Sequence, residues 1–110
     1  MKFTLAALAL AISGASAALI INTPVSAVVC KPLLITWSGG YAPFFLVVVP
    51  GNNPSGPALR NFGAQPGHSF TWVVNEPAGT SVGLLLKDST GAIAQSAPFT
   101  IQPSSDTSCL

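Results

Sequence analysis

Charged residues are scarce in this sequence. Only 6% of the 110 residues are Asp, Glu, Lys or Arg, with four cations against three acids. A nucleic-acid binder needs many cations to neutralise phosphates, and a disordered tail combines high charge with low hydrophobicity. The few cations exclude the first class, and the 49% of hydrophobic residues excludes the second. The short length leaves room for one small domain.

The groups that catalyse reactions or hold metals are equally few. One histidine, His68, and three acids, Glu76, Asp88 and Asp106, make up the acid–base inventory. No nucleophile elbow, phosphate-binding loop or short-spaced cluster of Cys and His accompanies them. The sequence therefore predicts a protein that is not an enzyme and has no metal and no cofactor. A small hydrolase is the least favoured alternative.

Long apolar runs are missing as well. A membrane-spanning helix needs about 20 apolar residues, whereas the run at residues 5–12 is less than half that length. Small residues, Ala15 and Ala17, follow the run, which is the layout of a secretory signal peptide cleaved after Ala17. We expect residues 1–17 to be removed and residues 18–110 to form a single secreted domain.

The end of the chain points to the same compartment. Polar residues fill positions 104–108, and no hydrophobic tail follows them, so no GPI anchor is expected. Beyond the signal peptide, Lys31, Arg60 and Lys87 balance the three acids. We expect a product that is freely soluble outside the cell and has no membrane span.

Cysteine occurs only twice, as Cys30 and Cys109. An even number of cysteines in a small secreted domain favours a disulfide. Two free thiols or an intermolecular bridge are the alternatives. An intramolecular bond would tie the end of the chain to an early strand.

Ten Gly and ten Pro argue against long helices, and the apolar residues follow the two-residue period of strands. The clearest case is Leu33, Ile35 and Trp37, which share one face. Further strands are expected at residues 18–22, 25–29, 70–74, 82–86 and 97–101. Residues 44–49 are apolar throughout, which predicts a central strand covered on both faces or one whose outer face meets a partner.

Turn-forming residues separate these strands. The longest turn-rich stretch, at residues 50–57, contains three prolines and two glycines and is expected to be an exposed loop. About seven short strands with such turns are typical of an all-β, immunoglobulin-like antiparallel β-sandwich.

The aromatic residues divide into two groups. Trp37 and Trp72 lie on the apolar faces of their strands and are expected in the core. Tyr41 follows two glycines in a loop, and Phe44 and Phe45 begin the continuous apolar run. We single out Tyr41, Phe44 and Phe45 as candidates for stacking against a ligand such as a sugar ring.

Four segments carry a family resemblance. They are Leu-Ile-Ile-Asn-Thr-Pro at 19–24, Leu-Leu-Ile-Thr-Trp-Ser-Gly-Gly at 33–40, Ser-Phe-Thr-Trp-Val-Val at 69–74 and Ser-Ala-Pro-Phe-Thr-Ile at 96–101. In this order they resemble the N-terminal domain of fungal cell-wall-synthesis proteins of the Kre/Knh type, also found in Ser/Thr-rich GPI-anchored surface proteins. More narrowly, the chain resembles the small secreted members common in mushroom-forming fungi, although it lacks the Ser/Thr-rich region and the anchor.

The resemblance implies an immunoglobulin-like fold, an extracellular location and a link to β-1,6-glucan assembly or wall attachment. It supplies no catalytic residues. We therefore favour a secreted, non-enzymatic protein associated with the cell wall or extracellular matrix. The alternatives are a carbohydrate-binding module that uses Tyr41, Phe44 or Phe45, and a secreted effector that binds another protein through a free sheet edge.

Overall fold

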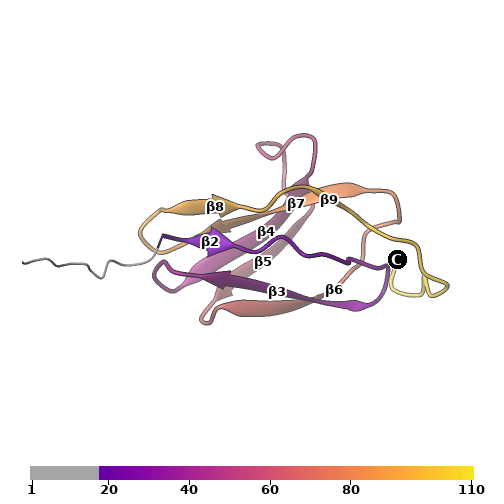
Figure 1. Cartoon of the computed structure of the whole chain (residues 1–110), viewed down its shortest axis with the longest axis horizontal. Coiled ribbons are helices and arrows are strands. Elements are labelled where there is room, and N and C mark those ends of the chain that lie inside the picture. Colours follow the sequence, from indigo (N-terminus) through magenta and orange to yellow (C-terminus); the bar gives the residue numbers. More distant parts are fainter. Residues whose placement is uncertain (1–17) are drawn as a thin grey trace, which may run out of the picture.

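The computed structural model describes residues 18–110, which form two antiparallel β-sheets in two layers (Figure 1). The predicted signal peptide at residues 1–17 lies outside the described residues. The three-stranded sheet has the order β2 (Ile20–Ile21), β3 (Pro32–Ser38) and β6 (Ser69–Val73). The five-stranded sheet has the order β5 (Arg60–Gln65), β4 (Phe44–Pro50), β7 (Ser81–Lys87) and β8 (Ile93–Gln95), and β9 (Phe99–Thr100) also pairs with β7. The prediction of an all-β fold is confirmed.

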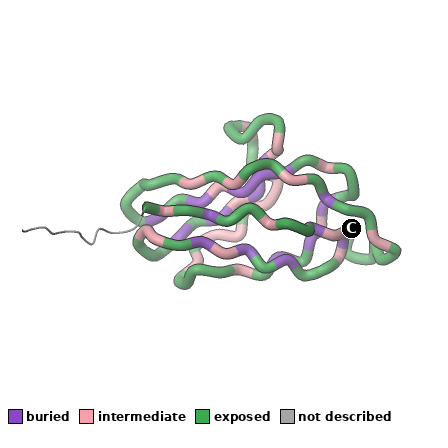
Figure 2. Tube along the Cα trace, in the orientation of Figure 1, coloured by how far each residue is buried: buried purple, intermediate pink, exposed green. Residues whose placement is uncertain are grey.

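The alternating strands lie as their sequences predict. In β3, Leu33, Ile35 and Trp37 are buried while Leu34 is exposed. The same change from buried to exposed residues runs along several strands in Figure 2. Residues of both sheets meet in one apolar core, where Trp37 and Trp72 are each only 3% exposed. The assignment of both tryptophans to the core is confirmed.

The continuous apolar run forms β4, which lies between β5 and β7 and is therefore an inner strand. Phe44 and Val48 face the core and are fully buried. Phe45 points to the opposite side and is 43% exposed. The sequence predicted either a strand covered on both faces or a strand whose outer face meets a partner. The first alternative is wrong, because Phe45 is exposed on the outer face.

Two strands were not expected. In β5, Gly63 has a φ of 72°, and the pairing with β4 shifts register between Leu46 and Val47. This irregularity interrupts the period-two pattern, so the strand has no clear signal in the sequence. β8 is only three residues long, which is too short for periodicity to show.

Three expected strands are shorter than predicted. Residues 18–22 contribute only the two residues of β2. Residues 97–101 contribute only the two residues of β9. Residues 25–29 contribute a single parallel bridge, between Val28 and Gln102. Around it, the Val29 N–H donates to the Gln102 carbonyl at 3.1 Å, and the Gln102 N–H donates to the Ala27 carbonyl at 2.7 Å. These bonds hold the C-terminal segment against the segment that precedes β3.

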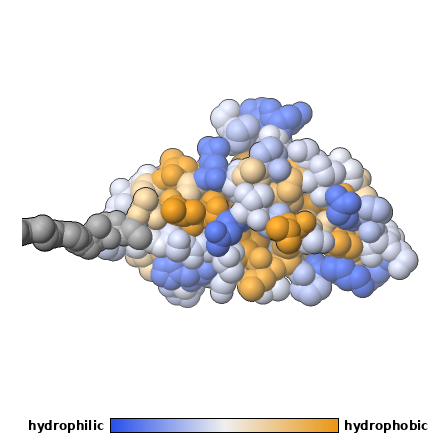
Figure 3. Space-filling model, viewed as in Figure 1, coloured by the Kyte–Doolittle hydropathy of each residue, from blue (hydrophilic) through white to orange (hydrophobic). Residues whose placement is uncertain are grey.

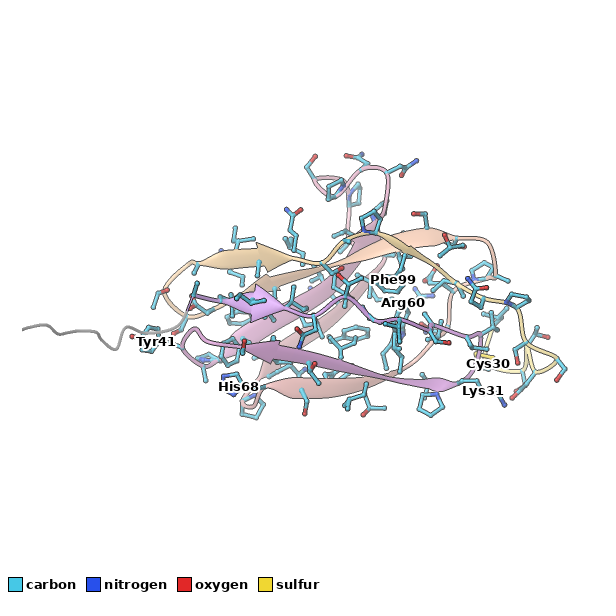
Figure 4. The ribbon with its side chains drawn as sticks, viewed as in Figure 1. Cys30, Lys31, Tyr41, Arg60, His68 and Phe99 are labelled. Carbon is cyan, nitrogen blue, oxygen red and sulfur yellow. A yellow bond between two sulfur atoms is a disulfide. The ribbon has the colours of Figure 1, made fainter. Side chains whose placement is uncertain are left out.

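The predicted disulfide is confirmed. Cys30 and Cys109 are bonded, with their Cα atoms 5.5 Å apart. The bond lies at one end of the molecule, and Tyr41 lies at the other (Figure 4). It fixes the last segment to the turn that precedes β3, so this segment cannot separate from the sheets. Residues 18–110 contain no helix long and apolar enough to cross a membrane.

Candidate functional site

The three aromatic candidates occupy different environments. The Phe44 ring packs against the Trp37 ring, with centroids 5.7 Å apart, and against the His68 ring at 4.9 Å. Since Phe44 is fully buried, no ligand can stack on it, and it is removed from the candidates. Tyr41 and Phe45 are 54% and 43% exposed and stay available.

Tyr41 belongs to a tightly bonded turn at the end of the molecule. The Tyr41 backbone N–H donates to the Asp88 carboxylate at 3.1 Å. Its carbonyl accepts hydrogen bonds from both the backbone N–H and the hydroxyl of Ser89, each at 3.0 Å. These bonds join the loop between β3 and β4 to the turn after β7, so the position of the Tyr41 backbone depends on Asp88.

Gly40 is required beside this turn. Its φ of 70° lies in the region that favours glycine. A Cβ atom there would lie 2.8 Å from Leu19 Cδ1 and 2.9 Å from Asp88 Oδ2. Any side chain at residue 40 would therefore strain the backbone and push against the Asp88 carboxylate.

Asp88 is 2% exposed and fully hydrogen-bonded. The Thr90 hydroxyl donates to Asp88 Oδ1 at 2.6 Å, and the backbone N–H groups of Thr90 and Ala92 donate to the same oxygen at 2.9 and 3.0 Å. The Thr90 hydroxyl is the largest cause that lowers the Asp88 pKa, and the backbone donors Tyr41, Thr90 and Ala92 lower it further. Burial opposes this effect, yet the pKa stays below its ordinary value.

The lowered pKa of Asp88 predicts that the stability of the fold decreases in acid. The unfolded Asp pKa is about 3.9, and the folded value is lower. Ionised Asp88 therefore stabilises the fold above about pH 4, and this stabilisation is lost as the pH falls through the folded pKa. Thermal melts from neutral to acidic pH should show the wild-type Tm falling below about pH 4. Asp88→Asn should melt lower at neutral pH and change less with acid.

Asp106→Asn is the matched control for this prediction. Its carboxylate accepts hydrogen bonds from the Ser108 hydroxyl and N–H at 2.6 and 3.0 Å, within the exposed C-terminal segment. The Ser108 hydroxyl lowers the Asp106 pKa as well, but this carboxylate is exposed to solvent, so we expect Asp106→Asn to lose less Tm at neutral pH than Asp88→Asn. An equal loss of Tm in both variants would contradict the role given to Asp88. So would an Asp88→Asn protein whose Tm falls with acid as much as the wild-type Tm does.

Phe45 lies on the outer face of the five-stranded sheet. Across the strands it pairs with Ala64 of β5 and Lys87 of β7, and Lys87 pairs with Ile93 of β8. Two residues along β4, Val47 points to the same side as Phe45 and pairs with Asn61 and with Leu85. Leu85 in turn pairs with Gln95. We call this surface the Phe45 face, and its members are Phe45, Val47, Asn61, Ala64, Leu85, Lys87, Ile93 and Gln95.

On the Phe45 face the inner strands β4 and β7 contribute three apolar residues and Lys87, and the outer strands β5 and β8 carry side-chain amides. Lys87 is its only charged residue. Asn61 Oδ1 accepts the Gly63 N–H at 2.8 Å, which leaves the amide NH₂ group for other partners. Among residues 18–110 the Gln95 side chain has no hydrogen-bond partner. A half-exposed aromatic ring on a face that also carries amide groups suits a ligand with apolar patches and many hydroxyls.

A small hollow of about 70 Å³ continues this face beyond Gln95. Gly83, in the middle of β7, lies among its lining residues, and a Cβ there would meet only Val49 Cγ2 at 3.7 Å. Pro54 and Pro98 contribute to the lining. Pro54 belongs to the loop at residues 50–57, which projects from the molecule in Figure 1 as an exposed loop, as predicted. A glycine inside a strand often marks a close approach of a ligand or another backbone.

The acids have structural partners and do not converge. Glu76 pairs with Arg60 at 2.8 Å, while Asp88 and Asp106 accept the hydrogen bonds described above. Arg60 also donates to the Asn75 side chain and carbonyl, each at 3.0 Å. Within residues 18–110 no three His, Cys, Asp or Glu side chains gather as a metal site would require. The predicted absence of enzymatic activity stays a prediction.

No protein-family model and no curated protein matches this chain. The resemblance to fungal wall proteins therefore stays an expectation carried by the four short segments. Sequence reasoning had already identified Phe45. It missed Asn61 and Gln95, because β5 and β8 were not expected.

Proposed function

We propose that this protein is a secreted, non-enzymatic fungal protein that associates with the cell wall by binding β-glucan through the Phe45 face. One observation carries the proposal: a half-exposed phenylalanine lies in a nearly uncharged sheet face bordered by two side-chain amides. Aromatic rings pack on the apolar faces of sugar rings, and amides bond to hydroxyls. A neutral polysaccharide fits this face better than a charged one.

The disulfide supports the extracellular location. Disulfide bonds persist in oxidising compartments and are rare in the cytosol. Cys30–Cys109 is consistent with the predicted secretion, which the signal peptide at residues 1–17 would direct. The resemblance adds the cell wall as the place of action and β-glucan as the polymer.

We further propose that the sandwich is immunoglobulin-like. Consecutive strands cross between the sheets after β3, after β5 and after β6, which is the connectivity of a Greek key. The segment before β3 supports this assignment. Its first part, β2, pairs with β3 in the three-stranded sheet, and Val28 forms a bridge with Gln102, which follows β9 of the five-stranded sheet.

Phe45→Ala tests the proposed binding face. We expect retention of the protein on insoluble β-glucan to weaken about tenfold, because an aromatic contact is lost. The fold should remain, since Phe45 lies on the outside of its sheet. Leu34→Ala is the matched control, because Leu34 is a 61% exposed apolar residue on the outer face of the other sheet.

Several outcomes would overturn the proposal. Equal retention of Phe45→Ala and the wild type would show that the Phe45 face is not the site. Retention on chitin but not on β-glucan would show that the bound polysaccharide is chitin. Failure to bind any wall polysaccharide would favour the alternative, a secreted protein that binds another protein.

A further inference from the structure

The edge of the three-stranded sheet has unpaired backbone groups. The Trp37 N–H donates to the His68 carbonyl at 3.0 Å, and the Val74 N–H donates to the Lys31 carbonyl at 3.1 Å. Antiparallel strands alternate between pairs that exchange backbone bonds and pairs that do not. The backbone groups of Ser69, Thr71 and Val73 therefore point away from β3, toward the open side of β6. In Figure 1, β6 forms the lower border of the molecule.

The other edges in the described part of the chain are less suited to pairing. β2 and β8 have two and three residues. β5 contains the register shift opposite Leu46 and Val47, and irregularities of this kind bend an edge away from new partners. β6 has five residues with no proline, glycine or lysine to block pairing.

We propose that β6 is a self-association site, where a second copy of this chain adds its own β6 antiparallel around a twofold axis at Thr71. In this register Ser69 of each copy faces Val73 of the other, and the two Thr71 residues face each other. These are the positions whose backbone groups are free, so each free donor meets a free acceptor. A twofold contact requires such a self-complementary patch, and Thr–Thr is a favourable cross-strand pair.

The charge distribution favours a second copy as the occupant. β2, β3 and β6 contain no charged residue. In Figure 3, apolar patches lie on the side of the molecule that carries β2 and β3, among polar atoms. Identical molecules bring identical charges together, so an uncharged sheet is a condition for pairing without repulsion. The dimer would present two Phe45 faces on one particle.

Charged substitutions at Thr71 test the proposed dimer. Sedimentation velocity of the secreted wild-type protein should show a monomer–dimer equilibrium that shifts with concentration. Thr71→Lys and Thr71→Glu each place like charges opposite one another, so the dimer dissociation constant should rise about tenfold or more. Mixing the two variants should restore the dimer, because opposite charges then meet across the axis.

Leu34→Lys is the matched control, since Leu34 pairs with Thr71 on the same face but lies one strand from the edge. It should dimerise as the wild type does. A wild type that is monomeric at every concentration would overturn the proposal. An unchanged dimer dissociation constant in both Thr71 variants would overturn it too. So would a mixture of the Lys and Glu variants that dimerises no more than either variant alone. Far-ultraviolet circular dichroism and Tm would verify that each variant is folded.

Discussion

Reduction of the Cys30–Cys109 bond is expected to lower the free energy of unfolding by about 4–5 kcal/mol. The bond spans a sequence separation of 79 residues, so it removes a large part of the conformational freedom of the unfolded chain. The stability of a small domain is of similar size. The Tm should fall by roughly 20 °C or more, as measured by melts with and without a reductant.

Cys109→Ser gives an independent version of the same experiment. Cys30 has a φ of 61°, so changing Cys109 removes the bond without altering that backbone position. We expect Cys109→Ser to melt with the reduced wild type, and reductant to have no further effect on it. Equal Tm values for oxidised and reduced wild type would contradict the stabilising role of the bond.

Trp37→Ala and Trp72→Ala are each expected to cost about 3–5 kcal/mol, the cost of removing a large aromatic side chain from a packed core. Both residues are almost completely buried. Chemical denaturation would measure the loss, and either variant could fail to be secreted. A Trp72→Ala protein that folds normally and loses glucan binding would show that Trp72 belongs to the binding site and not to the core.

The Phe variants separate the two tryptophans. The Trp72 indole N–H donates to Asn75 Oδ1 at 2.9 Å, whereas the buried Trp37 indole N–H has no partner among the described residues. Replacing Trp72 with Phe therefore loses a hydrogen bond, and replacing Trp37 with Phe removes an unsatisfied donor. We expect Trp72→Phe to cost about 1 kcal/mol more than Trp37→Phe. The reverse order would contradict these hydrogen-bond assignments.

The sequence predicts those parts of the fold in which local pattern and packing agree. β3 alternates cleanly because one face meets the core and the other meets water, so Leu33, Ile35 and Trp37 were placed correctly. The disulfide followed from the number of cysteines and the expected compartment. These features depend on residue type and spacing, both of which the sequence contains.

The inward and outward faces of β4 could not be predicted. Every residue from 44 to 49 is apolar, so the pattern does not show which alternate set faces the core. The pairing of β4 with β5 and β7 decides it, and this pairing is nonlocal. Phe44 became a core residue and Phe45 a surface residue for this reason. Asn61 joins the face through the pairing of β4 with β5, and Gln95 joins it through the pairing of β7 with β8.

The β-glucan binding that we propose for the Phe45 face can be mapped residue by residue. The most direct measurement is an NMR titration of the ¹⁵N-labelled protein with a soluble β-glucan oligosaccharide. We expect saturable shifts that gather at Phe45, Leu85 and Lys87 and leave Leu34 and Thr71 unchanged. Shifts confined to the three-stranded sheet, or none at saturating oligosaccharide, would contradict the proposal.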